Sequence, residues 1–242
     1  MENRSQEQPW RLRVLVEPRG FIKILEFILA VCMFATTAGY GDELRYTITC
    51  NKTGGPQNKK FKIAYPFELN KVLVPGGCTM GDYYLGGDAS GAAKFFVCIG
   101  VLAFLYVIGI TAWYVFLEHK HLNWDMVPMA DFVIHCFFTL FFFISSCVWA
   151  AGVNEVKTHT DFDNIQEDVL SAECMNTNNT CKLTDPLSFA SLNVSLLFGF
   201  LNAVVWGGNC WFVYKETSLF GNKRDVDNTE AEKNVDVPTN TI

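Results

Sequence analysis

Three long stretches of the chain contain no Asp, Glu, Lys or Arg. They cover Phe95–Leu117, Phe132–Val153 and Pro186–Tyr214, and they are 23, 22 and 29 residues long. A helix needs about 20 apolar residues to cross the hydrocarbon core of a bilayer. The three stretches therefore predict transmembrane helices, and they exclude an ordinary soluble fold for this part of the chain.

A fourth span is predicted at Phe21–Tyr40, which contains Lys23 and Glu26 in its first two turns. Long charged side chains near a helix end can reach the headgroups, so we expect both to act as anchors there. They are also one turn apart and could pair with each other. A cleaved signal peptide is the alternative, but a polar lead of 20 residues precedes this stretch and no clear cleavage site follows it.

The expected fold class is therefore an all-α membrane protein, a four-transmembrane-helix bundle with a small disulfide-linked, β-containing lumenal loop. The four helices are expected at about residues 21–41, 92–117, 130–153 and 186–214. Residues 1–20 form a cytosolic N-terminal segment in this prediction, and the polar residues 218–242 form a disordered cytosolic tail. Four spans place both termini on one side, and the loops 42–91 and 154–185 on the other.

The cysteines indicate which side is which. Five of the nine lie within the spans, and each long loop holds one pair: Cys50 and Cys78, then Cys174 and Cys181. Disulfides persist in oxidising compartments, so these pairs predict that both loops are lumenal and both termini cytosolic. Four free thiols on the cytosolic side are the alternative.

Glycosylation sequons support the same orientation. Asn51 and Asn178 begin sequons in the two long loops, and we expect both to be accessible to glycosylation. The sequon at Asn193 lies in or against the last helix, where we expect it to stay unmodified.

The first long loop has the pattern of a small folded unit. Its segment "LRYTITC" alternates, which places Leu44, Tyr46, Ile48 and Cys50 on one side of a strand. The segment "FKIAYPFEL" alternates in the same way, and Pro66 makes it an edge or bulged strand. A small β-meander over the bundle is therefore expected.

One face of the last span is polar and small. At 100° per residue, one sector holds Ser188, Ser191, Ser195, Asn202 and Asn209, and the small residues Gly199, Ala203 and Gly207 fall beside it. This packing face comprises Ser195, Gly199, Asn202, Ala203, Gly207 and Asn209. Small residues let helices approach closely, and Ser or Asn can hydrogen-bond across the contact. A pore lined by the same face in an oligomer is the alternative.

Two ionisable residues, Asp131 and His135, lie four apart at the start of the third span. Intramembrane ionisable residues are candidates for a proton or partner site. The structural alternative places Asp131 in the first helical turn, where the helix dipole favours a carboxylate. His135 has no second ligand at metal-binding spacing.

No arrangement of residues suggests catalysis. The sequence has no metal motif, nucleophile elbow or phosphate-binding glycine loop, so we expect a non-enzymatic protein without a metal or organic cofactor. The net charge of −6 comes without a basic block, so no nucleic-acid partner is expected.

Six segments between Val16 and Thr217 have the pattern of a known family: "EPRGFIKILEF", "YPFEL", "GDASGAAKFF", "PMADF", "WAAGVNEVK" and "SLNVSLLFGFLNAVVWGGNCWFVYKET". Through them the chain resembles the synaptophysin family of four-span vesicle proteins, and its last span is most similar to the pantophysin and mitsugumin-type branch. The tail differs from that of the neuronal members, because it is short and acidic and has no tyrosine. Tail-dependent roles are therefore not expected here.

The resemblance implies a MARVEL-type bundle with cytosolic ends, the bridges Cys50–Cys78 and Cys174–Cys181, and glycosylation at Asn51. It also implies homo-oligomers in cholesterol-rich membrane of transport, secretory or synaptic-like vesicles, with cholesterol as a bound lipid and a synaptobrevin-type fusion protein as partner. The expected function is to organise lipid and partner proteins in vesicle trafficking and exocytosis. The alternative function is an oligomeric channel or transporter lined by the Ser/Asn face of the last helix.

Overall fold

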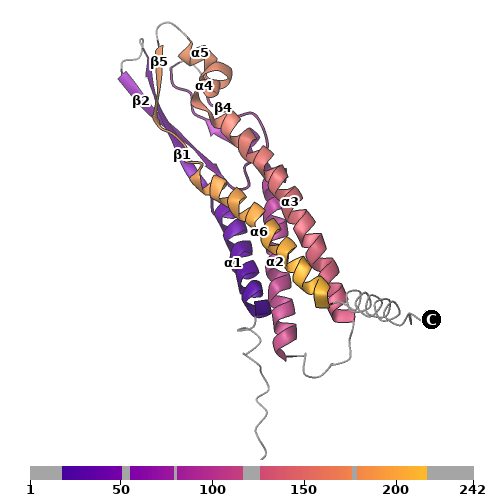
Figure 1. The fold of residues 1–242 in the computed structure, drawn as a ribbon. Helices are drawn as coiled ribbons and strands as arrows, with labels where there is room; N and C mark the ends of the chain where they lie inside the picture. Colours follow the sequence, from indigo (N-terminus) through magenta and orange to yellow (C-terminus); the bar gives the residue numbers. More distant parts are fainter. Residues whose placement is uncertain (1–17, 51–54, 79–80, 117–125, 176–178, 217–242) are drawn as a thin grey trace, which may run out of the picture.

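The computed structural model describes residues 18–50, 55–78, 81–116, 126–175 and 179–216. Four long helices form a bundle, and a small sheet stands at one end of it (Figure 1). Asn51, Asn178, residues 1–17 of the expected N-terminal segment and the expected tail lie outside the described residues.

The four spanning helices are α1 (Pro18–Ala38), α2 (Ser90–Phe116), α3 (Met126–Thr160) and α6 (Ala190–Glu216). Each contains an apolar segment long enough to cross a bilayer: Phe21–Ala38, Ser90–Trp113, Met129–Thr160 and Ala190–Lys215. The four-helix membrane fold expected from the uncharged stretches is therefore confirmed.

The third helix is longer than expected at both ends. It begins at Met126 rather than near residue 130, and Pro128 is accommodated in its first turn, where a proline removes no helical hydrogen bond. It continues to Thr160, seven residues beyond 153. At 1.5 Å per residue its 35 residues extend about 50 Å, more than the hydrocarbon thickness of about 30 Å. The polar end of α3 therefore projects from the membrane towards the sheet.

Within the bundle, α1 packs against α2 and α6, and α3 packs against the same two helices. Large side chains fill the interior, and Phe96, Phe142, Trp149 and Trp206 are completely buried. The outer surface is apolar as well, as expected for helices that face lipid. Leu105, Leu140, Leu197 and Val204 are among its exposed side chains.

The sheet has three antiparallel strands in the order β2 (Gly55–Ala64), β1 (Gly41–Cys50), β5 (Asn179–Asp185). Leu44, Tyr46, Ile48 and Cys50 of β1 are all buried, as the alternation predicts. The second strand ends at Ala64, ahead of Pro66, which has no N–H to offer a neighbour. The third strand comes from the second long loop, so the two loops form one unit.

Shorter elements complete this unit. They are η2 (Leu69–Lys71), β3 (Leu73–Val74), β4 (Tyr83–Tyr84), α4 (Phe162–Asn164), η4 (Ile165–Val169) and α5 (Ser171–Cys174). The strands β3 and β4 pair with each other as a small antiparallel ribbon.

Two disulfides hold the loops, as expected. Cys50 is bonded to Cys78, and Cys174 is bonded to Cys181. Glu173 joins the two loops, because its buried carboxylate accepts hydrogen bonds from the backbone N–H of Gly77 at 2.7 and 3.0 Å. An ionised acceptor makes these bonds stronger than neutral ones.

The joint between sheet and bundle is also hydrogen-bonded. The carboxylate of Asp42 accepts from the backbone N–H of Ser188 at 2.7 Å, and the Tyr40 hydroxyl donates to the carbonyl of Ser188 at 3.2 Å. Burial raises the pKa of Tyr40 to about 12, so this phenol remains a donor at neutral pH. The start of β1 and the residue before it are therefore held to the segment that leads into α6.

Among the glycines of α6, Gly199 lies closest to the neighbouring helices. A Cβ atom at this position would lie 2.7 and 2.9 Å from ring atoms of Phe96, and it would also collide with the hydroxyl of Ser146. Gly208 of the same helix has nothing within 4 Å of such an atom. Gly199 is therefore the point where α6 requires the absence of a side chain.

This difference gives a matched pair of substitutions. Gly199→Ala should lower the free energy of unfolding by about 1–3 kcal/mol, because it overpacks the centre of the bundle. Gly208→Ala should leave stability unchanged or raise it, because alanine favours helix and meets nothing there. Unfolding of both variants in detergent micelles measures the difference, and equal stabilities would contradict the packing described here.

Candidate functional site

Charged and polar side chains from all four spanning helices meet inside the bundle, near the helix ends opposite the sheet. We call this group the terminal cluster. It comprises Lys23 and Glu26 of α1, Tyr106 of α2, Asp131 and His135 of α3, and Asn209 of α6. Glu26 and His135 are fully buried, and Lys23 is only 8% exposed.

The centre of the cluster lies between α1, α3 and α6. The Lys23 ammonium is 2.7 Å from Nε2 of His135 and 3.2 Å from the Glu26 carboxylate. The Asn209 amide nitrogen donates to Glu26 at 2.8 Å and lies 3.0 Å from the same His135 Nε2. Each of these side chains therefore contacts at least two others, which ties the three helices together.

The second half of the cluster joins α3 to α2. His135 Nδ1 lies 2.7 Å from the backbone carbonyl of Asp131 and 3.1 Å from its carboxylate. The Tyr106 hydroxyl donates to that carboxylate. The ring of Trp206 lies against the His135 ring with centroids 5.0 Å apart, and the Lys23 ammonium is 5.8 Å from the Tyr106 and Trp206 ring centres. Aromatic rings therefore enclose the charges and supply cation–π attraction.

Two expectations about these residues are wrong. Lys23 and Glu26 do not reach the headgroups as anchors, because both side chains point into the bundle and pair there. Asp131 is not in the first turn of its helix, because α3 begins at Met126. The Asp131 carboxylate contacts His135 and accepts a hydrogen bond from Tyr106.

A signal for this cluster exists in the sequence. The pair Lys23 and Glu26 lies three apart, and the pair Asp131 and His135 lies four apart, so each pair shares one helix face. Both pairs lie near the ends of spans that begin on the same side of the membrane, and Asn209 lies near the end of a span that returns to that side. These residues therefore lie at similar depths in the membrane, which indicates that they can meet inside the bundle.

The polar residues on the sheet side of α6 also face neighbouring helices. Ser195 is completely buried and accepts a hydrogen bond from the indole N–H of Trp149 on α3 at 3.0 Å. Gly199 lies against Ser146 of α3 and Phe96 of α2. One turn before Ser195, the hydroxyl of Ser191 donates to the carbonyl of Thr36 on α1 at 2.9 Å.

The remaining residues of the predicted face lie further from the sheet and also face the interior of the bundle. Asn202 is fully buried, donates to the carbonyl of Phe198 at 2.8 Å, and lies 3.9 Å from the sulfur of Met33 on α1. Ala203 is partly buried against the core, and Gly207 lies beside Thr139 of α3. The face is thus inside a single bundle, so an oligomeric pore lined by it would require the bundle to open.

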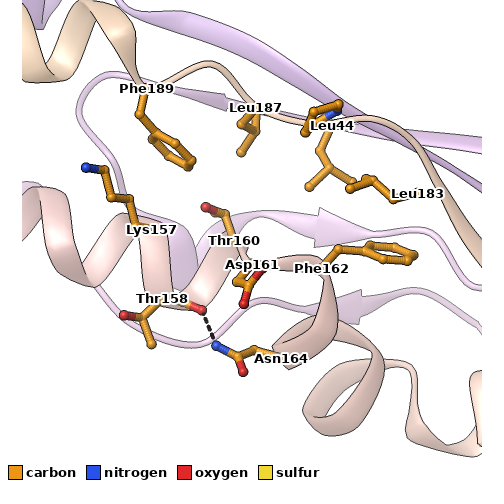
Figure 2. A pocket seen from close by; sticks show the side chains of 11 residues that line it. Leu44, Lys157, Thr158, Thr160, Asp161, Phe162, Asn164, Leu183, Leu187 and Phe189 are labelled. Atoms are coloured by element: carbon orange, nitrogen blue, oxygen red, sulfur yellow. Dashed lines mark hydrogen bonds between the residues drawn. The ribbon is translucent and has the colours of Figure 1, made fainter.

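A hollow in the surface lies near the sheet, at the end of the bundle opposite the terminal cluster. It has a volume of about 410 Å³ and separates the end of α3 from the linker that precedes α6 (Figure 2). Leu44, Leu183, Leu187 and Phe189 form one wall, whereas Lys157 and the polar residues after it form the other. Its Asn164 amide donates to the carbonyl of Thr158 at 2.9 Å and is thus already engaged. Among the described residues of the whole chain, His, Cys, Asp and Glu form no group that could hold a metal ion.

The terminal cluster should be important for stability. Glu26→Ala leaves Lys23 without its buried counter-charge, so the free energy of unfolding should fall by about 3–5 kcal/mol. The control is Glu43→Ala in the sheet, because Glu43 also contacts a lysine, Lys60, at 3.1 Å but at the exposed surface. That variant should unfold at nearly the wild-type denaturant concentration, since exposed pairs are screened by water. Similar losses in both variants would show that burial of the cluster has no special effect.

The comparison with known families agrees with this architecture. Residues 14–212 match the model of the MARVEL family, which is described as a membrane-associating domain. The match includes the four spanning helices apart from the last residues of α6, both segments that form the sheet, and every described residue of the terminal cluster. This chain is therefore a multi-pass membrane protein that belongs to the MARVEL family.

Proposed function

We propose that this protein is a non-enzymatic component of transport or secretory vesicles, where it organises membrane lipid and partner proteins during trafficking and exocytosis. Within the MARVEL family, the proposal places it in the synaptophysin group, near the pantophysin and mitsugumin-type branch, because of the segments quoted above. The observation that carries the functional part is the separation of side chains in the bundle: the charged residues of the terminal cluster, Asn202 and Asn209 are buried, and broad apolar faces point outward.

The outward faces of α3 and α6 supply the surface for lateral association. Their exposed large apolar residues are Val133, Phe137, Leu140, Phe143, Ile144 and Val148 on α3, and Val194, Leu197, Phe200, Leu201, Val204, Trp211 and Phe212 on α6. Such faces suit lipid, cholesterol included, a second copy of the chain, or the single span of a synaptobrevin-type fusion protein. In membranes, association between such faces depends on packing rather than on the hydrophobic effect.

The proposal includes an orientation. The sheet and its disulfides face the vesicle lumen, and both termini face the cytosol, because disulfides form in oxidising compartments. Asn51 and Asn178 are then accessible to glycosylation. Asn193 is excluded because it lies in α6, and Ser195 of its sequon is buried against Trp149.

Proximity labelling tests location and orientation together. A labelling enzyme fused to the C-terminus should mark cytosolic vesicle proteins and synaptobrevin-type fusion proteins in living cells. The same enzyme inserted between residues 176 and 178 should mark lumenal proteins instead. Enrichment of another compartment by both fusions, or lumenal neighbours of the C-terminus, would contradict the proposal.

Glycosidase treatment gives an independent control of orientation. The shift in mobility should disappear after Asn51→Gln and Asn178→Gln together. It should be unaffected by Asn193→Gln, since that position lies on a helix with a buried sequon serine. A shift that depends on Asn193 would show that the start of α6 is misplaced.

A further inference from the structure

We propose that the hollow between the end of α3 and the linker before α6 binds the headgroup of a phospholipid with a quaternary ammonium, such as phosphatidylcholine, from the adjacent membrane leaflet. The phosphate of the lipid contacts Lys157, and its ammonium lies against Asp161. The inference rests on the geometry of the hollow and is independent of the vesicle function proposed above.

The hollow lies at the level where the bundle leaves the hydrocarbon. On this side of the membrane the apolar segment of α3 ends at Thr160 and that of α6 begins at Ala190, and the lining residues flank both points. The 27 residues of α6 extend about 40 Å, which matches a bilayer with its headgroups rather than the hydrocarbon core alone. A headgroup can therefore enter the hollow while its chains stay in the leaflet.

The ammonium of Lys157 is suited to a phosphate. It lies at the end of the hollow beside α3 and the start of α6, next to Phe189 (Figure 2). It donates to the amide oxygen of Asn193 at 3.0 Å and lies 5.7 Å from the centre of the Phe189 ring. Neither contact supplies a negative charge, and an ammonium has three donors, so donors and charge are left for a phosphate oxygen.

The carboxylate of Asp161 supplies the opposite charge further from the membrane. Asp161 follows Lys157 by four residues, about one helical turn along the direction of α3, and Figure 2 shows it between Lys157 and Phe162. It directly precedes α4, where a side chain commonly caps the helix, but it makes no such hydrogen bond. A cation near the bundle and an anion beyond it match a headgroup whose phosphate lies nearer the membrane than its ammonium.

The rest of the lining favours an ammonium without N–H groups. The hydroxyls of Thr158 and Thr160 already donate to carbonyls within α3, at 3.0 and 2.6 Å. A quaternary ammonium has no donor to satisfy, and it is recognised by aromatic and apolar surface beside a negative charge. The apolar lining residues are Leu44, Phe162, Leu183, Pro186, Leu187 and Phe189.

The size of the hollow fits this ligand class. Its volume of about 410 Å³ is within the range of small-ligand sites, about 300–1,000 Å³. Its single lining carboxylate, Asp161, cannot satisfy the three donors of a primary ammonium, whereas it can balance the charge of a quaternary one.

Native mass spectrometry of the full chain in a maltoside detergent, which contains neither phosphate nor ammonium, tests the proposal. The probes are dioleoylphosphatidylcholine and dioleoylphosphatidylglycerol, which share their chains and phosphate and differ in the quaternary ammonium. The wild type should bind one molecule of the choline lipid about tenfold more tightly than the glycerol lipid. Equal affinities for the two lipids would overturn the proposal.

A matched pair of substitutions tests the role of Asp161. Asp161→Asn should remove the preference for the choline lipid, because it removes the charge that faces the ammonium. Asp163→Asn changes an exposed carboxylate two residues later, outside the lining, and it should retain the preference. The same preference in wild type and Asp161→Asn would overturn the assignment of the ammonium site.

A second pair tests the phosphate contact. Lys157→Gln should weaken the binding of both lipids, whereas Lys94→Gln should not, because Lys94 pairs with Glu68 at the start of α2 and does not line the hollow. Undiminished binding of both lipids by Lys157→Gln would overturn the phosphate contact. If Lys157→Gln does not fold, Asp161→Asn still decides, since the Asp161 side chain has no cap hydrogen bond to lose.

Glycerophosphocholine distinguishes the membrane lipid from its free headgroup. It carries both charges without chains, so it should displace the bound choline lipid only at a far higher concentration than the lipid itself. Displacement at an equal concentration would overturn the membrane as the source of the ligand.

Discussion

A polar group in hydrocarbon has no water to bond with, so it must find its partners within the protein. In this bundle, Lys23 and Glu26 face that requirement most acutely, because they are charged and buried. They find their partners in His135 and Asn209, on two other helices. This requirement determines how α1, α3 and α6 are rotated about their axes, since each must present one particular face at one particular depth.

The rest of α6 follows from that rotation. Once Asn209 points at Glu26, the residues at helical spacing towards the sheet point inward as well, among them Asn202 and Ser195. Gly199 lies on the same side and allows Phe96 and Ser146 to approach. The opposite side of the helix is left with Leu197, Leu201 and Val204, which are exposed to lipid. A single inward stripe thus serves both the polar contacts and the closest helix approach.

Much of the architecture could be predicted from the sequence, because its signals are local. The lengths of the uncharged stretches predict the spans, the alternation in "LRYTITC" predicts β1, and the distribution of cysteines between loops predicts the two bridges. The pairing of β5 with β1 was not predicted, because it joins segments about 130 residues apart and nothing local indicates it. The terminal cluster was missed for a similar reason. Each of its pairs has a plausible local role, at the headgroups for Lys23 and at a helix start for Asp131, and only the antiparallel arrangement brings the pairs together.

Side chains from different helices stabilise the bundle jointly through the terminal cluster. A double-mutant cycle between Glu26→Leu and Asn209→Leu measures this most directly, since these residues meet at 2.8 Å from α1 and α6. Unfolding free energies of the wild type, both single variants and the double variant should give a coupling energy of about 0.5–3 kcal/mol. Additive losses, with coupling below about 0.5 kcal/mol, would contradict the claim, because residues without a shared interaction behave in that way.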